Sequence, residues 1–335
     1  MEQNIITGVF LPIAIAIIMW GMGLSLVVDD FRRVLFYPKA VAIGLFGQLV
    51  VLPLVGFFIA STFNLPPEYA VGLMIIALCP GGPTSNLISF LSRGDVALSV
   101  TLTAVSNTVT VITIPPLVNW MLIHFMGQGT TLQLPFLQTV VQISLLTIVP
   151  VALGMWMRAK RPEFAAEADF PVKVASVTLL VLVILAAIIR ERAIIVQAFI
   201  DVGPATLMLS AGSMAIGFAI AAIMRLNWSQ RITSGIEVGI QNGTLAIALA
   251  SGATFLNNPA MAIPPAIYSL VMFGTAAAFG FFINARIGRR QCACCHDRFL
   301  LDIFDLNRTK GERDSEIPAA VATAPSSRVQ TSTGF

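Results

Sequence analysis

The chain has 335 residues, and its 20 Lys and Arg with 17 Asp and Glu make charged residues 11% of the total, against roughly a quarter in an ordinary soluble domain. Hydrophobic types make up 56%, the mean hydropathy is +0.85, and the formal net charge is only +3. These values exclude a soluble globular protein and a disordered chain, and the small number of basic residues excludes a nucleic-acid binder. The composition is that of a protein that crosses a membrane several times.

Nine apolar stretches follow one another, each long enough for a helix of about 20 residues that crosses roughly 30 Å of hydrocarbon. The first is long and has no basic start, so we expect a membrane helix and no cleaved signal or transit peptide. The predicted fold class is an all-α polytopic membrane protein with nine transmembrane helices. The expected spans are residues 5–28, 37–61, 68–92, 95–125, 134–158, 173–199, 202–225, 229–256 and 261–285.

The basic residues gather on one side of these spans. If the first helix enters from outside, every Lys and Arg except Arg190 and Arg192 falls in a cytoplasmic segment, and the loops around Asn64, Gln128 and Asn258 contain none. The positive-inside rule therefore predicts an outside N-terminus and a cytoplasmic C-terminus in the cell membrane. The expected cytoplasmic segments are 29–39, 93–95, 158–173, 225–231 and the tail from Arg286.

The last 44 residues (292–335) lack the hydrophobic pattern of the rest. We expect a disordered cytoplasmic tail, because this polar segment cannot bury enough apolar surface to fold. Its CACCH cluster, Cys292 to His296, fits a lipidation site, a metal site or a solvent-facing group without chemistry. Zinc ligands are usually better separated, which favours the last of these.

Residues 79–86, with the sequence CPGGPTSN, interrupt the third apolar stretch. Two prolines around two glycines remove backbone donors and helix propensity at mid-membrane depth. Unpaired backbone in hydrocarbon costs several kcal/mol per group, so such a break persists only where it lines a polar cavity or is buried in protein. Because Thr84, Ser85 and Asn86 follow at once, we expect a true break rather than a proline kink.

The eighth stretch contains Glu237, the one acid that we place deep inside a span. A charge near the bilayer centre costs at least about 2.5–3.5 kcal/mol, so the carboxylate is expected to face a functional cavity. The alternative is a neutral carboxylic acid that is hydrogen-bonded between helices. Gln241 lies one turn further on the same face, and Asn242-Gly243 is a chain-reversal signal, so a second break is predicted here.

The two breaks occupy corresponding places in two halves of the chain. Spans two to four match spans seven to nine in opposite orientation, and each third member carries a double proline, Pro115-Pro116 and Pro264-Pro265. Paired broken helices in inverted repeats indicate the central site of a secondary transporter. The ends of the half-helices offer carbonyl groups to cations and amide groups to anions.

On these motifs the chain resembles the bile acid:sodium symporter family, in its bacterial nine-span form, over about residues 5–290. The resemblance lies in CPGGPTSN, in the following SRGDVALSVTLTAVS, and in EVGIQNGTLAIALA of the second half. It implies a panel domain and a core domain whose discontinuous helices cross at the membrane centre, with two sodium ions behind the crossing. The implied transporter domain is 1–291, with the core at about 37–125 and 202–285 and the panel at about 5–28 and 134–199.

The same resemblance implies two sets of sodium ligands that share Glu237. All of them present oxygen atoms, which suits a small hard cation, and the pairs Ser99/Thr103 and Glu237/Gln241 each share a helix face. The first implied site is Ser85, Asn86, Ser99, Thr103 and Glu237, and the second is Gln48, Glu237, Gln241 and the backbone carbonyls of Val238 and Ile240.

Thr84 and Asn242, one at each break, are the candidate substrate contacts. Pro83-Thr84 departs from the family pattern, in which a Thr followed by a small residue often stands, so the identity of the substrate stays open. The bile acid label of the family is not taken literally, since relatives carry pantoate, pyruvate and other carboxylates.

The leading hypothesis is sodium-coupled symport of a bile acid-like, pantoate-like or other carboxylate anion by alternating access. A metalloid (arsenite-type) efflux carrier of related fold is the alternative, which Cys79 in the first broken helix favours weakly. An enzyme is not expected, because HExxH, GxSxG and paired catalytic carboxylates are missing, and His124 and His296 lie at a span end and in the tail. The expected partners are sodium, a small organic anion and the bilayer, without nucleic acid or an obligate protein partner.

Overall fold

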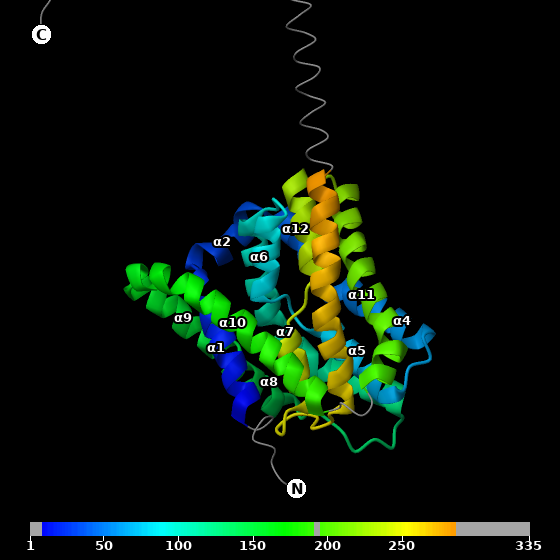
Figure 1. Ribbon diagram of the computed structural model, residues 1–335. Coiled ribbons are helices and arrows are strands. Elements are labelled where there is room, and N and C mark those ends of the chain that lie inside the picture. The colour runs from blue at the N-terminus through cyan, green and yellow to red at the C-terminus, as the bar shows by residue number, and fades with distance from the viewer. Residues whose placement is uncertain (1–8, 191–194, 286–335) are drawn as a thin grey trace, which may run out of the picture. The chain divides into compact units, whose positions relative to one another are not determined.

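The computed structural model describes residues 9–190 and 195–285, and all regular elements in these ranges are helical (Figure 1). The described residues up to Asn284 form one compact unit. The predicted tail and its CACCH cluster lie outside the described residues. The elements are, in chain order, α1 (Leu11–Ser25), α2 (Val28–Phe36), α3 (Pro38–Phe46), the π-helix η2 (Gly47–Val51), α4 (Leu52–Thr62), α5 (Pro67–Leu78), α6 (Pro83–Leu91), α7 (Val96–Met126), α8 (Phe136–Leu146), α9 (Ile148–Lys160), α10 (Pro162–Arg190), α11 (Ile195–Ile223), α12 (Trp228–Gly239), α13 (Gly243–Ser251), the short 3-10 turn η3 (Ala260–Ala262) and a last helix over 263–285.

Within residues 9–190 and 195–285, five continuous helical segments are long and apolar enough to cross a membrane, and two bent pairs raise the number to seven. The bent pairs are α1 with α2, at 64°, and the two parts of α10, at 43°. The protein is therefore a multi-pass membrane protein whose described part is all-helical. The five segments are Pro38–Thr62, Val96–Met126, Phe136–Lys160, Val196–Ile223 and Ala260–Ala285.

The helix boundaries around the sixth and seventh predicted spans were wrong. Helix α10 begins at Pro162 rather than at 173, and α11 begins at Ile195 rather than at 202. Hydropathy placed both starts after polar residues. In α10, the helix instead begins at Pro162, a residue type favoured at the first helical position, and continues through alanines, which are good helix formers. The predicted cytoplasmic segment 158–173 is consequently helical over most of its length.

The predicted segment 29–39 also contains a helix, α2. Its start is capped by Asp30, whose carboxylate accepts a hydrogen bond from the Val27 backbone N–H at 2.8 Å. Arg33 forms an ion pair with the same carboxylate at 3.4 Å. Thr101 of α7 donates to the Asp30 carbonyl at 2.9 Å, so this short helix is fastened to the start of α7.

Both predicted helix breaks are present, and they touch each other. Helix α5 ends at Leu78 and α6 starts at Pro83, while α12 ends at Gly239 and α13 starts at Gly243. Gly81 and Gln241 form an antiparallel bridge, and the Asn242 N–H donates to the Pro80 carbonyl at 2.9 Å. Each unwound segment thus supplies backbone partners to the other, which removes part of the cost of interrupting a helix inside a membrane.

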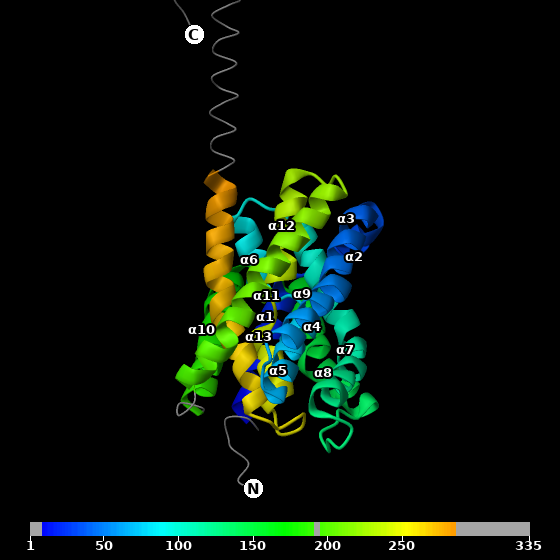
Figure 2. The same cartoon turned by 90° about the vertical axis from the view of Figure 1, so that its right-hand side faces the viewer.

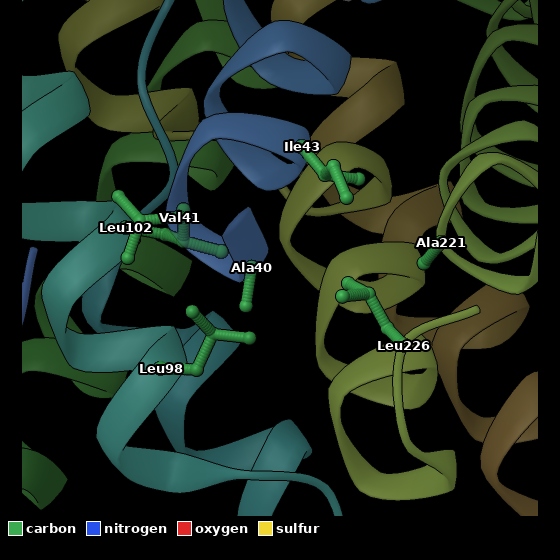
Figure 3. Close-up of a cluster of buried hydrophobic side chains, with 7 residues drawn as sticks. All are labelled: Ala40, Val41, Ile43, Leu98, Leu102, Ala221 and Leu226. Carbon is green, nitrogen blue, oxygen red and sulfur yellow. The ribbon is translucent and has the colours of Figure 1, made fainter. Parts of the chain in front are cut away.

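A buried apolar cluster joins the helices that flank the breaks. It fixes α3 against the first turns of α7 and the end of α11 (Figure 3). Leu102 also marks a close approach, because a Cβ atom added at Gly44 would lie 2.6 Å from its Cδ2 atom. The members are Ala40, Val41, Ile43, Leu98, Leu102, Ala221 and Leu226.

Helix α1 packs on α9 and α10, and Figure 1 shows α1 and α10 side by side. Two glycines make the α1–α9 contact close: a Cβ atom at Gly23 would meet the Val151 carbonyl, and one at Gly154 would meet the Trp20 carbonyl. Small residues at membrane helix interfaces permit this close backbone packing.

The turns between helices gather at two ends of the unit. The turns at 63–66, 127–135 and 252–259 lie together at one end, and those at 92–95 and 224–227 lie at the other (Figures 1 and 2). The first group contains the three loops without basic residues.

Candidate ion and substrate site at the helix breaks

Glu237 lies in the last turn of α12 and is fully buried. Its carboxylate accepts hydrogen bonds from two hydroxyl groups of α7, Ser99 at 3.0 Å and Thr103. The ion pairs among the described residues, Arg32–Asp29 and Arg33–Asp30, do not involve it. A buried carboxylate without a basic neighbour takes up a proton or a cation, because an isolated charge is costly there.

The first break adds further oxygen atoms to this carboxylate. The Ser85 hydroxyl lies 3.3 Å from that of Thr103 and 2.8 Å from the Gly82 carbonyl. The Asn86 Oδ1 atom lies 3.4 Å from the Thr103 hydroxyl. The Thr103 hydroxyl has one proton but three oxygen neighbours, on Ser85, Asn86 and Glu237. One proton cannot serve all three contacts, so oxygen atoms outnumber protons around Thr103. All five residues of the first implied set are therefore close together, in an arrangement that suits a cation.

Two neighbours of this cluster were not predicted as part of the site. Ser89 of α6 donates from its hydroxyl to that of Ser99 at 3.3 Å. At Gly81, an added Cβ atom would collide with the Glu237 carboxylate. The glycine of the break therefore makes room for the acid.

Four residues of the second implied set are in contact, namely Gln48, Glu237, Val238 and Gln241. Gln48 donates from Nε2 to the Gln241 Oε1 atom at 2.7 Å and to the Cys79 carbonyl at 3.1 Å. Gln241 donates to the Val238 carbonyl at 2.9 Å and reaches the Glu237 carbonyl at 3.4 Å. Thus the Glu237 side chain belongs to the first set and its backbone adjoins the second. Ile240 follows α12 in an extended conformation, and its N–H donates to the Ile236 carbonyl at 2.9 Å.

Gln48 lies in a π-helical turn that the sequence did not predict. The Leu52 N–H donates to the Gly47 carbonyl, five residues back, rather than to residue 48. Such turns are frequent at functional sites because they displace the helix register locally. The available signal was Pro53, whose missing N–H leaves one carbonyl of the preceding turn without its usual donor. A Cβ atom at Gly47 would lie 2.9 Å from Val238, so this glycine permits the approach to α12.

Tyr268 of the last helix is a further residue near this site that the sequence did not predict. It is fully buried, and its hydroxyl donates to the Gly239 carbonyl at 2.9 Å. The Ser210 hydroxyl approaches the same carbonyl at 3.4 Å and lies 2.7 Å from that of Thr275. A lone tyrosine in an apolar span is the only signal for this contact, since a buried Tyr hydroxyl usually has a partner.

The two candidate substrate residues, Thr84 and Asn242, line one small cavity of about 30 Å³. Its wall includes the first residues of α6 and α13, together with Ile18 of α1 and Ser176 of α10. The Asn242 Oδ1 atom accepts from the Thr244 hydroxyl and the Leu245 N–H, whereas its buried Nδ2 makes no hydrogen bond to the described residues. Two helix N-termini and an unpaired amide donor favour a negatively charged group at this point.

Comparison with known proteins decides the family. A model of the sodium bile acid symporter family matches residues 12–198, more than half of the chain. The chain belongs to this family. It is 31% identical to the uncharacterized sodium-dependent transporter YocS of Bacillus subtilis over 84% of this chain and 85% of that protein. The family consists of sodium symporters, so this member is a transporter and not an enzyme.

Two further relatives show the breadth of the family. The chain is 32% identical to the probable sodium/metabolite cotransporter BASS1, chloroplastic, of Arabidopsis thaliana, over 80% of its own length. The chain spans 65% of the length of that plant protein, just under two thirds. Identity to the human ileal sodium/bile acid cotransporter is 28%, over 84% of this chain and 80% of that protein.

Proposed function

We propose that this protein is a sodium-coupled symporter that moves an organic anion across the cell membrane by alternating access. The observation that carries the proposal is the Glu237 carboxylate, which is buried without a basic partner among hydroxyl and amide oxygens at the crossing of the two breaks. The relatives named as sodium-dependent transporters and cotransporters support the same ion.

The proposed stoichiometry is two sodium ions per cycle, one at each set of oxygen ligands. The first ion binds to Ser85, Asn86, Ser99, Thr103 and the Glu237 carboxylate. The second binds to Gln48, Gln241, Glu237 and the carbonyls of Val238 and Ile240. At this second site, the side-chain N–H groups of Gln48 and Gln241 now donate to the Cys79 and Val238 carbonyls. The ion takes the place of these N–H groups as the partner of the carbonyls.

The proposed architecture has nine spans, because the broken pairs α5–α6 and α12–α13 add two to the seven counted above. The core consists of the helices at 37–125 and 202–285, and the panel of α1 and α8–α10. With the basic-free turns outside, the N-terminus is external and the C-terminus cytoplasmic.

The proposed substrate is a carboxylate, held in the small cavity by Thr84 and Asn242. The unpaired Asn242 Nδ2 atom supplies a donor, and the N-terminal ends of α6 and α13 supply partial positive charge. Cys79 is buried and lines no described cavity at the breaks, so no observation favours the metalloid carrier.

Uptake by reconstituted liposomes tests the proposal. Two sodium ions with one monovalent anion carry one net positive charge, which gains about 2.3 kcal/mol per 100 mV of membrane potential. Uptake of radiolabelled carboxylates should therefore require sodium and increase when the interior is made negative. Equal uptake in choline and sodium would refute symport, and sodium-independent arsenite flux would favour the metalloid carrier.

A further inference from the structure

A cavity of about 190 Å³ lies away from the helix breaks, between α2–α3 and the first turns of α7 and α12. Arg33 and Tyr37 line it from the end of α2, Asp95 and Thr101 from the start of α7, and Gln230 from α12. None of its lining residues belongs to the implied sodium sites or to the candidate substrate contacts. The proposed transport therefore leaves this cavity without a role.

Two residues of opposite charge line this cavity without forming an ion pair with each other. Arg33 pairs with Asp30 at 3.4 Å, and one Asp95 oxygen accepts from the Leu98 N–H at 3.0 Å as the N-cap of α7. A guanidinium group has five N–H donors and a carboxylate has two acceptor oxygens, so each group keeps hydrogen-bonding capacity for a ligand. Because Asp30 already balances Arg33, the Asp95 carboxylate leaves a net negative charge, which disfavours a purely anionic ligand.

Gln230 and two helix ends add donors for the negative part of a ligand. Gln230 is 9% exposed, and its Oε1 atom accepts from the Asn227 N–H at 3.4 Å in the N-terminal cap of α12. This contact uses none of the Gln230 amide protons. The N-terminal ends of α7 and α12 carry partial positive charge, so together with Arg33 they favour a phosphate, while Asp95 favours an ammonium group. The lining therefore suits a ligand that carries both groups.

The cavity lies at the level where lipid headgroups meet the protein. Arg33 and Asp95 stand just before two membrane-crossing segments, which begin at Pro38 and Val96, and α2 and α3 lie at the same end as the start of α12 (Figure 2). Leu35 and Phe36 of α2 are 81% and 76% exposed. Phe36 comes three positions after Arg33, so it flanks the side of α2 that lines the cavity. Acyl chains are the apolar partner that a bilayer supplies at this place.

We propose that this cavity binds the headgroup of a phosphatidylethanolamine, a phospholipid with both a phosphate and a primary ammonium group. The phosphate accepts from Arg33 and Gln230, the ammonium group donates to Asp95, and the acyl chains lie along Leu35 and Phe36. A choline headgroup has no N–H to donate, and a glycerol headgroup has no positive charge. A cavity of roughly 150 Å³ holds benzene, so this one accommodates a phosphoethanolamine group. The inference goes beyond the proposed function and does not rest on it.

Binding of defined lipids to the intact purified protein tests this inference. Native mass spectrometry would measure the first bound lipid in mixtures of dioleoyl phosphatidylethanolamine, phosphatidylcholine and phosphatidylglycerol, which share their acyl chains. Phosphatidylethanolamine should bind about tenfold more tightly than either competitor, because only this lipid supplies both a phosphate and an N–H donor for the carboxylate. Equal binding of the three lipids would overturn the inference.

The variant Asp95→Asn then assigns the preference to this cavity. Asparagine keeps a side-chain oxygen for the Leu98 N–H and so preserves the N-cap of α7, but it removes the charge that attracts the ammonium group. The preference for phosphatidylethanolamine should be lost. Asp29→Asn is the matched control and should keep the preference, because Asp29 pairs with Arg32 on the exposed surface and does not line the cavity. A retained preference in Asp95→Asn would overturn the assignment.

A second pair of variants and a soluble headgroup test the phosphate contact and the lipid. Arg33→Gln should weaken the binding of all three lipids, whereas Arg32→Gln, outside the cavity, should not. Unchanged phosphatidylethanolamine binding in Arg33→Gln would overturn the inference. Glycerophosphoethanolamine, which has the headgroup without acyl chains, should bind weakly, and equally tight binding would overturn a lipid as the ligand. None of these measurements involves sodium or transport, so their failure and that of the proposed function are distinguishable.

Discussion

The acid at position 237 shows how one residue links the two proposed ion sites. Its side chain reaches the α7 hydroxyl groups, while its backbone carbonyl adjoins the Gln241 amide. The sequence predicted a functional acid from the cost of its burial. The hydroxyl partners Ser99 and Thr103, 138 and 134 positions earlier, were implied only by the family resemblance, and the structure brings them into contact.

Replacing Glu237 by Gln tests its proposed role in sodium binding. The substitution keeps the size but removes the negative charge, so sodium affinity should fall at least tenfold, a change of about 1.4 kcal/mol. The measurement is the sodium-dependent rise in the thermal unfolding temperature of the purified protein. Glu68→Gln, at the start of α5, is the control. A normal sodium response in Glu237→Gln would identify Glu237 as a structural acid.

Removing the Tyr268 hydroxyl should weaken the anchor of α12. In Tyr268→Phe the Gly239 carbonyl keeps only the longer contact from Ser210. The stability of the protein should decrease by about 1–3 kcal/mol, because a buried acceptor loses its main donor. Thermal unfolding without sodium measures this loss. Tyr37→Phe, at a position that is 59% exposed, should have almost no effect, and equal effects of the two substitutions would contradict the anchor.

At the scale of elements, the two helix breaks depend on each other. Pro80 and Asn242 are joined by a backbone hydrogen bond, and Gly81 and Gln241 by an antiparallel bridge. Prolines and glycines predicted where each helix stops, because their effect on backbone geometry is local. The pairing of the breaks is a tertiary contact, and so is the π-turn that holds Gln48 against Gln241.

Adding one methyl group at Gly81 tests the fit between a break and the buried acid. In Gly81→Ala the new Cβ atom would collide with the Glu237 carboxylate. Sodium-dependent stabilisation should be lost, and the protein should be destabilised by about 1–3 kcal/mol through overpacking. Gly212→Ala in α11, where nothing lies within 4 Å, should be neutral or stabilising. Thermal unfolding with and without sodium compares the two, and an unchanged sodium response in Gly81→Ala would contradict the proposed geometry.

At the scale of the whole molecule, the proposed coupling joins the ion cluster at Glu237 to the small substrate cavity, because the same helix breaks contribute residues to both. Ser85 belongs to the ion cluster, while the preceding residue, Thr84, lines the small cavity. Binding at one place therefore constrains the segment that forms the other. Linkage requires that sodium raises substrate affinity by the same factor by which substrate raises sodium affinity.

Loss of first-site ligands should reduce this coupling. In the double variant Ser99→Ala with Thr103→Ala, the factor by which sodium increases carboxylate affinity should decrease, although neither residue lines the small cavity. Titrations of one carboxylate at several sodium concentrations measure the factor. Thr101→Val is the control, because its hydroxyl donates to the Asp30 and Ala97 carbonyls, away from the ion cluster. Full coupling in the double variant would exclude Ser99 and Thr103 as ligands.

The sequence by itself determined the membrane class, the two helix breaks and the buried acid, because hydropathy, proline and glycine geometry, and the cost of a buried charge act through each residue alone. It placed the starts of α10 and α11 wrongly, because hydropathy does not report where a helix begins. Only the tertiary structure decided that Gln48 contacts Gln241 and that Tyr268 holds Gly239. Those facts depend on which side chains meet across helices that are far apart along the chain, and no local pattern encodes such a meeting.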